Sequence, residues 1–228
     1  MSDGLPNKPK TLRGAFVEFG LSLPPLVVVF QFNPLQLTRS RSLSYTTPNE
    51  SSARTLREFH NQVSSLPDLQ KEQRVTVQEE TMNFDIRLDA TDKLNERHRI
   101  TEQFGVAPQL ATLELMLHPK GESLLGGLVD DLLGLNQKGF SFTKKPNPPM
   151  ILFIWGRKRV LPVNMNSMNI TETEFSSDLN PIRATVAVNL TVIEGQSIPY
   201  LYSKAMTEAM SALNLANIKE VADVVIPG

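Results

Sequence analysis

Two long segments of this chain change the strand face on which their apolar residues fall, and this restricts the folds open to it. Within Val160–Phe175 the apolar residues Leu161, Val163 and Met165 lie at odd positions, whereas Met168 and Ile170 lie at even positions. Neighbouring side chains of a strand point to opposite faces, so a flat strand with this pattern would turn part of its core face to solvent. We therefore expect a β-bulge near Asn166–Ser167, as the corners of β-barrels require.

The segment Arg74–Ala90 has the same property. Its apolar residues are odd in the first half and even in the second, at Val75, Val77, Met82, Phe84, Ile86 and Leu88. A bulge or a tight break near Gln78–Thr81 would bring both halves into register with a core.

The run Leu26–Phe32 (LVVVFQF) is the strongest strand signal in the chain. It is apolar at nearly every position, which predicts a strand buried on both faces. Asn33-Pro34 ends it, because proline removes a backbone donor and restricts the residue before it. Three other segments are predicted to be strands, namely Thr11–Gly20, Met150–Trp155 and Ala184–Ile193.

Leu35–Tyr45 alternates between polar residues at even positions and a mostly apolar odd face, which Arg39 and Arg41 interrupt. This pattern predicts a single half-buried strand. The two arginines have two interpretations. They lie at a sheet margin and extend into water, or they face another subunit.

Helical patterns occupy the middle and the end of the chain. Asp92 is a predicted N-cap of a helix that ends near Gly105, and Pro108 fits the first turn of a second helix that runs to about His118. The tail from Tyr200 to Val224 also has helical composition. The fold class is therefore β-rich α+β, with a helical middle segment and a C-terminal helix.

The chain divides into a β domain over residues 11–195 and a helical C-terminal docking tail over residues 196–228. Two insertions interrupt the β domain. Residues 46–71 are polar and predict a flap with a short helix at Arg54–Val63, and residues 120–148 form an apolar, glycine-punctuated insertion.

Composition excludes several classes of function. The net charge of −1 gives no electrostatic reason to expect nucleic acid. The absence of cysteine excludes disulfides, thiolate metal sites and a cysteine nucleophile. Residues 1–10 lack the design of a signal peptide, and the longest apolar run is far too short to span a membrane. We expect a soluble protein that assembles in the cytoplasm.

No pattern typical of catalysis is present in the sequence. The three histidines, His60, His98 and His118, lack metal-ligand spacing, and no nucleophile elbow occurs. Gly121–Gly127 lacks the Gly-Lys-Ser/Thr of a phosphate loop. Glu79 and Glu80 are neighbours and so point to different faces of a strand. We predict a structural protein that assembles with other subunits and has no cofactor, metal site or enzyme activity.

Two sets of motifs carry a family resemblance. The first is Val29–Pro34 (VFQFNP) followed by Leu37–Ser40 (LTRS), and the second is Arg159–Val163 (RVLPV) followed by Leu179–Ala184 (LNPIRA). Together they resemble the tube-domain proteins of contractile injection systems, over roughly residues 11–195. Among these the chain is most similar to baseplate-proximal members, described as tube initiators or LysM-bearing baseplate adaptors.

The resemblance implies a tube-type fold, either a two-sheet β-sandwich or a small β-barrel. It also implies a homo-oligomer, a hexameric ring that stacks with an adjacent tube ring, the spike hub and baseplate proteins. The motif positions that become candidates for assembly are Phe32, Asn33, Pro34, Arg39, Arg159, Pro162, Asn180, Pro181 and Arg183.

Many relatives of this type carry a C-terminal LysM module, for which residues 196–228 are too few. We therefore expect a tube initiator or inner-baseplate subunit that links spike hub to tube in a phage-tail-like particle. The alternatives are a repeating inner-tube subunit and, from a different class, a glycan-binding baseplate adaptor.

Overall fold

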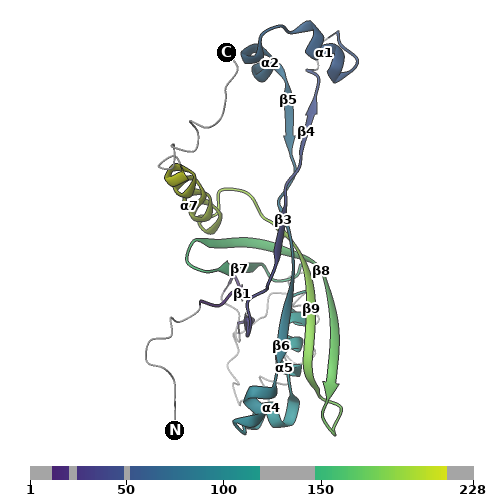
Figure 1. The fold of residues 1–228 in the computed structure, drawn as a ribbon, viewed down its shortest axis with the longest axis vertical. Helices are drawn as coiled ribbons and strands as arrows, with labels where there is room; N and C mark the ends of the chain where they lie inside the picture. The colour runs from purple at the N-terminus through teal and green to yellow at the C-terminus, as the bar shows by residue number, and fades with distance from the viewer. Residues whose placement is uncertain (1–11, 21–24, 49–51, 119–146, 215–228) are drawn as a thin grey trace, which may run out of the picture.

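The computed structural model describes residues 12–20, 25–48, 52–118 and 147–214 (Figure 1). The strands are β1 (Ala15–Glu18), β2 (Val27–Val29), β3 (Leu37–Ser40), β4 (Leu43–Thr46), β5 (Arg74–Val77), β6 (Thr81–Asp89), β7 (Ile151–Trp155), β8 (Arg159–Phe175) and β9 (Pro181–Val192). The helices are α1 (Leu56–Gln62), α2 (Leu66–Glu72), α3 (Thr91–Asn95), α4 (Arg99–Phe104), α5 (Ala107–Leu115) and α7 (Ile198–Asn214). The β-rich α+β prediction, with helices in the middle and at the end, is confirmed.

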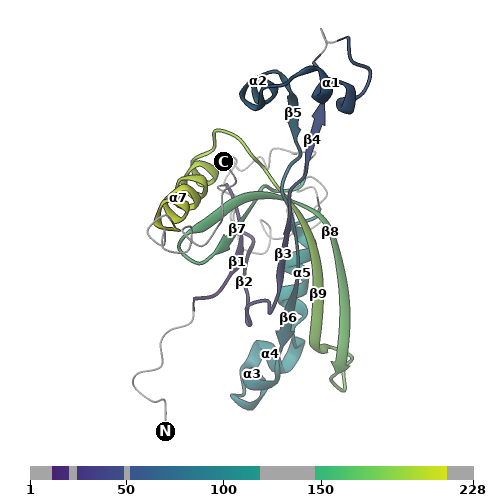
Figure 2. The same ribbon diagram turned by 45° about the horizontal axis from the view of Figure 1, so that its top comes forward.

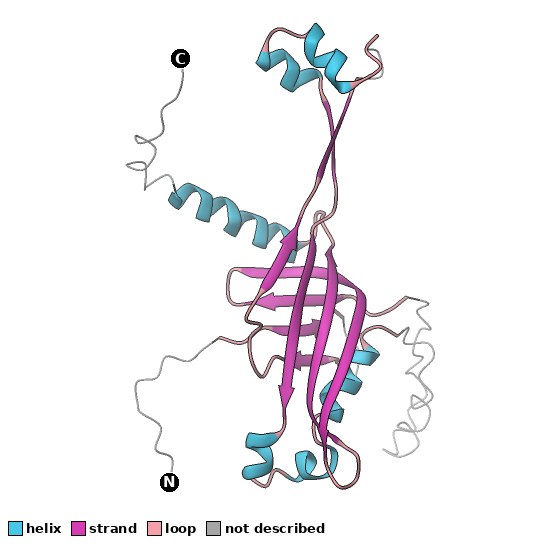
Figure 3. Cartoon of the chain, turned by 45° about the vertical axis from the view of Figure 1, so that its right-hand side comes forward, coloured by secondary structure: helices cyan, strands magenta, loops and turns pink. Residues whose placement is uncertain are grey.

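Seven strands form one curled antiparallel sheet in the order β2-β1-β7-β8-β9-β6-β3. Strand β8 belongs to both halves of this sheet, because it pairs with β7 up to Val163 and with β9 from Val163 onward. The register shifts between Met165 and Ser167, so the predicted bulge is confirmed. Figure 3 shows the short strands of one half crossing the long strands of the other half steeply.

The core lies inside the curl, where four phenylalanines from different parts of the sheet meet. The ring centroids of Phe16 and Phe30 are 5.1 Å apart, and those of Phe84 and Phe153 are 5.2 Å apart. Helix α5 adds buried leucines to the same cluster. Because both halves of the sheet contribute rings, this cluster fixes the curl as well as the individual strands.

Strands β4 and β5 form a separate two-stranded sheet that projects from the curled sheet and carries α1 and α2 at its tip (Figure 2). We call Leu43–Val77 the arm. The short helix predicted in residues 46–71 is confirmed by α1, where Thr55 and Glu58 form a capping box. The predicted break at Gln78–Thr81 is also confirmed, since the chain leaves the arm there and enters β6.

Two strand predictions are wrong. The segment Leu26–Phe32 is not buried on both faces, because only the face of β2 that carries Val28 meets the core, and Val27 and Val29 on the other face are 44% and 54% exposed. Leu35–Tyr45 is not one strand, because the chain passes at its centre from β3 in the curled sheet to β4 in the arm.

The helical middle segment also differs from its prediction. The N-cap is Ala90 rather than Asp92, and the predicted helix breaks at Arg97, whose φ is 55°. His98 then caps α4, which ends at Gly105 as predicted. Pro108 lies in the first turn of α5, also as predicted. Residues 119–146, with Gly121–Gly127, and residues 215–228 lie outside the described residues.

Candidate functional site

The half of the curled sheet made by β3, β6, β9 and β8 has one apolar face and one polar face. Even-numbered residues of β6 and β9 point into the core, and small polar side chains dominate the opposite face. We call this opposite face the polar face. Its members are Thr38, Ser40, Asn83, Asp85, Arg87, Ser167, Asn169, Thr171, Thr173, Thr185, Ala187, Asn189 and Thr191.

Side-chain amides join the strands across the polar face. The Nδ2 of Asn189 donates to Oδ1 of Asn83 at 2.6 Å, and the Nδ2 of Asn166 donates to Oδ1 of Asn189 and Oγ1 of Thr191, each at 2.7 Å. Asn166 is the extra residue of the β8 bulge. The bulge therefore does more than bend the strand, because it adds an amide to this face.

Strand β8 has an edge without a neighbour among the described strands. Beyond Val163 it pairs with β9 alone. Two backbone hydrogen bonds fix the direction of the backbone groups of β9: Val192 N–H donates to Glu80 O and Ile193 N–H donates to Pro162 O, both at 2.8 Å. The backbone N–H groups of even residues in β9 therefore point toward β6, and those of odd residues point toward β8. By the alternation of antiparallel ladders, the N–H groups of Met168, Ile170 and Glu172 point away from β9.

Strand β3 forms the other edge of this half-sheet. The backbone groups of even residues in β6 point toward β9, so those of its odd residues point toward β3. Thr38 and Ser40 pair with the odd residues Asn83 and Thr81, so their backbone groups point toward β6. The backbone N–H groups of Leu37 and Arg39 therefore point outward. The polar face is thus flanked on both sides by strand edges that can accept a further strand.

The first family motif lies at one end of the polar face. Phe32, Asn33 and Pro34 line an open groove there, and Arg183 lines the same groove. The Asn33 side chain is engaged within the chain, because its Oδ1 accepts from Gly14 N–H at 2.9 Å and its Nδ2 donates to Leu12 O at 2.8 Å.

Arg183 ties the end of β6 to the β8–β9 hairpin. Its Nε donates to Oδ2 of Asp89 at 2.8 Å, and its Nη1 donates to Oε1 of Glu174 at 2.6 Å. Burial acts to raise the pKa of Asp89, but hydrogen bonds from Thr91 and the Arg183 guanidinium outweigh it, and the pKa of this carboxyl falls below its usual range. The ionised form of Asp89 is therefore the stabilising one.

This lowered pKa predicts an acid-dependent loss of stability. A carboxylate whose folded pKa is depressed contributes stability above its unfolded pKa of about 3.9 and loses it as the pH falls through the folded value. We expect Asp89→Asn to be less stable than the wild type at pH 7, with the gap closing below about pH 4. Urea unfolding from pH 7 to pH 3 measures it, and a gap independent of pH would contradict the ionic role of Asp89.

The second family motif holds the helical middle segment against the sheet. The Nδ2 of Asn180 donates to Gln103 O at 2.8 Å, and Pro181 O accepts from Val106 N–H at 2.9 Å. Gly105 lies directly beneath Pro181, with a φ of +56° and no room for a Cβ atom. Asn180 and Pro181 therefore fix the corner between α4 and α5.

The remaining motif arginines lie near one buried carboxylate, Glu80, whose side chain is 8% exposed. Arg39 forms an ion pair with Glu80, and Arg41 Nη2 lies 3.4 Å from its Oε2. Burial lowers the pKa of Arg159, the nearby charge of Arg39 adds to this and Glu80 opposes it. Neither interpretation of Arg39 and Arg41 had included a carboxylate of the same chain.

Pro162 lies in β8 opposite Leu152, at a position whose missing N–H would point away from β7. It therefore breaks no ladder bond of the β7–β8 pair. Eight of the nine motif residues thus fall into separate clusters at the groove, at Glu80 and at the α4–α5 corner, and Pro162 lies apart from all three. Their role in assembly stays a prediction.

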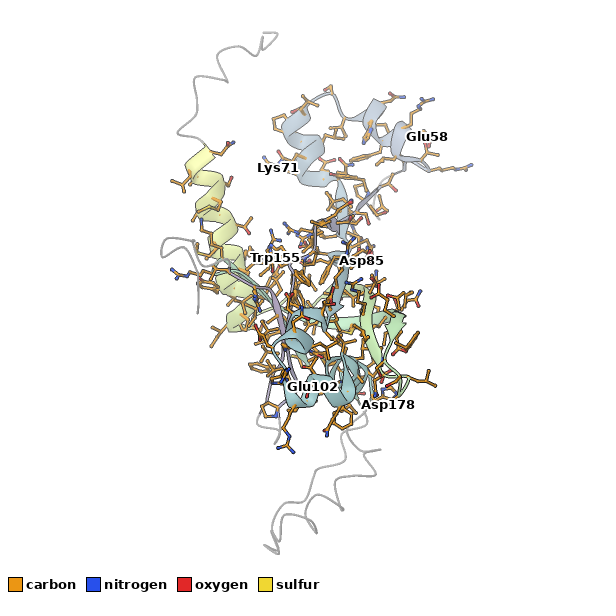
Figure 4. All side chains as sticks on the ribbon, turned by 60° about the horizontal axis from the view of Figure 1, so that its bottom comes forward. Glu58, Lys71, Asp85, Glu102, Trp155 and Asp178 are labelled. Carbon is orange, nitrogen blue, oxygen red and sulfur yellow. The ribbon has the colours of Figure 1, made fainter. Side chains whose placement is uncertain are left out.

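The two ends of the long axis carry different elements. Figure 4 shows Glu58 and Lys71 at the tip of the arm and Glu102 and Asp178 at the other end of the molecule. No helix among the described residues has both the length and the apolar character to cross a membrane. In the same part of the chain, no three potential metal-ligating side chains gather.

A family model described as contractile injection system tube protein matches residues 22–197. The matched region contains β2 to β9, whereas β1 and α7 lie outside it. No curated protein matches the chain.

Proposed function

The chain belongs to the contractile injection system tube protein family, which makes it a structural component of a phage-tail-like machine, and we propose that it forms a ring at the baseplate end of the inner tube. In this role it links the spike hub to the tube. The ring is hexameric, as the family resemblance implies, and it assembles in the cytoplasm.

The observation that carries this proposal is the polar face with a strand edge on either side. Adding the β8 edge of one copy to the β3 edge of the next makes a heterologous contact, which closes into a ring when the rotation permits it. Each contact also covers an edge that would otherwise promote aggregation. The polar faces of all copies then line the lumen, where small polar side chains suit the passage of cargo.

Two features favour the baseplate end over a repeating tube position. The arm and α7 both extend from the curled sheet that carries the polar face (Figure 1), and α7 lies beyond the family match. A ring between unlike neighbours needs contacts that a repeating ring does not. The arm, α7, the insertion 120–148 and the turn Arg157–Arg159 are the segments proposed to make them.

Copy number in purified particles tests this position. Quantitative mass spectrometry, with a known tube subunit of the same particle as the reference, should find as many copies of this chain per particle as one ring contains. This copy number should not depend on tube length. A copy number that grows with tube length would favour the repeating inner-tube subunit. A chain that is absent from particles and binds peptidoglycan would favour the glycan-binding adaptor. The same particles, tested for activity on cell-wall material, check the prediction that the chain is not an enzyme.

A further inference from the structure

A charged cluster lies at the root of the arm, outside the polar face and its edges. The root consists of the two connections between the arm and the curled sheet, residues 41–42 and 78–80. In it, Gln78 N–H donates to Ser42 O at 2.9 Å. Glu80 lies in the connection from β5 to β6 and Arg41 lies in the connection from β3 to β4. The two residues are joined by the contact of 3.4 Å between Arg41 Nη2 and Glu80 Oε2. Arg39, at the end of β3, holds the same carboxylate from the sheet side.

A second carboxylate, Glu194, lies beyond the end of β9 and faces two elements at once. Its Oε1 accepts from Arg41 Nη2 at 2.5 Å and from Glu80 N–H at 3.3 Å. Its Oε2 accepts from the hydroxyl of Tyr200, in the first turn of α7, at 3.0 Å. One oxygen of Glu194 therefore holds the arm root, and the other holds α7.

The contact with Glu194 requires a protonated Tyr200 hydroxyl, because that hydroxyl is the donor. Burial raises the pKa of Tyr200 most, and the hydrogen bond and charge of Glu194 raise it further, against a smaller opposite effect of Arg41. A tyrosine with an ordinary pKa of about 10 is protonated at neutral pH, and the raised pKa keeps Tyr200 a donor in more alkaline solution as well.

The rest of α7 is held by few contacts. Among its described residues only Ser203 is buried, and it bonds through its hydroxyl to Val160 N–H at 2.8 Å and Val160 O at 2.7 Å. Tyr202 donates to Arg157 O at 2.7 Å. These are polar contacts to a strand edge and a turn, so α7 lies at the low end of local stability.

The arm stem is also weakly held. Among the described strands, β4 and β5 pair only with each other, and their facing residues Leu43, Tyr45, Val75 and Val77 are all exposed. An isolated two-stranded hairpin is marginal in water. Two elements of low local stability thus share one anchor.

We propose that the chain Glu80–Arg41–Glu194–Tyr200 couples the arm to α7, so that moving one element changes how firmly the other is held. Coupling of this kind is reciprocal, because each element changes the free energy of the other by the same amount. A partner that pulls the arm loosens α7, and a partner that binds α7 changes the mobility of the arm. This inference concerns a single subunit and stands independently of the proposed ring.

Hydrogen–deuterium exchange on the full chain tests the coupling in both directions. Tyr200→Phe, which removes only a hydroxyl from α7, should speed exchange of the arm strands β4 and β5 about five-fold. The matched control is Tyr202→Phe, which removes the neighbouring hydroxyl outside the network. It should loosen α7 locally and leave the arm at the wild-type rate.

The reverse direction uses Arg41→Gln, which should speed exchange in the second half of α7 by a similar factor. Its control is Arg74→Gln, an arginine on β5 outside the network. Exchange of β6 amides reports whether each variant is folded. Equal arm exchange in Tyr200→Phe and Tyr202→Phe, or equal α7 exchange in Arg41→Gln and Arg74→Gln, would overturn the proposal.

Discussion

Gly105→Ala is expected to lower the free energy of unfolding by about 2 to 6 kcal/mol, the sum of the costs of backbone strain and overpacking. The added Cβ would overlap the carbonyl oxygen of Pro181, and the φ of +56° disfavours any side chain. The corner cannot relax easily, because Val106 N–H and the Asn180 side chain hold both sides of it. Urea unfolding followed by circular dichroism measures the loss.

Two other glycines separate the causes of this effect. Gly156 has a φ of +67°, and apart from its chain neighbours no described residue comes within 4 Å of the point that a Cβ would occupy. Gly156→Ala should therefore cost about 1 kcal/mol, from strain alone. Gly195 has neither a positive φ nor a close neighbour, so Gly195→Ala should be neutral or slightly stabilising. A Gly105→Ala loss no greater than that of Gly156→Ala would show that the corner is not tightly packed.

Glu172→Pro is expected to abolish incorporation of the chain into particles while leaving its fold intact. The Glu172 N–H points away from β9, so proline removes no ladder bond inside the subunit. It does remove a donor from the edge proposed to pair with β3 of the next copy. We expect at least a ten-fold drop in particle-bound chain, since a closed ring loses this bond at every interface.

Glu172→Thr is the matched control, because it loses the same charge but keeps the backbone N–H. It should enter particles at close to the wild-type level. The unfolding free energies of the two variants should agree within about 1 kcal/mol, as for proline at an exposed strand edge. Equal incorporation of both variants would contradict strand pairing through β8.

The strand pattern allowed much of the curled sheet to be predicted. The parity change after Met165 located the β8 bulge, and the even apolar positions of β6 gave its core face correctly. These features depend on a period of two along one strand, which the sequence displays directly. The capping box of α1 depends on a similarly local pattern, because Thr55 and Glu58 are three residues apart, so the sequence alone is enough to predict it.

The errors arose where distant segments decide the structure. The alternation of Leu35–Tyr45 continues through a point at which the chain changes sheets, so no local signal marks the break. Burial of Glu80 depends on arginines about 40 residues earlier in the chain. Helix α2 had a local signal that was missed, since Ser65 precedes a helix with proline in its first turn.

The candidate site was predicted only in part. The family motifs pointed to Asn180, Pro181 and Arg183, but their contacts with α4, Asp89 and Glu174 could not be read from spacing. The amide chain on the polar face was not predicted either, because it joins the β8–β9 hairpin to β6, and Asn83 and Asn189 are 106 residues apart in the sequence. Its one local signal was the asparagine at the bulge.

Cryo-electron reconstruction of particles from the native source tests the central claim most directly. We predict a single six-fold ring of this chain between the spike hub and the first tube ring, with the polar face toward the lumen and β8 of each copy beside β3 of the next. Many stacked copies along the shaft, or a particle in which the chain occupies no ring, would contradict the account.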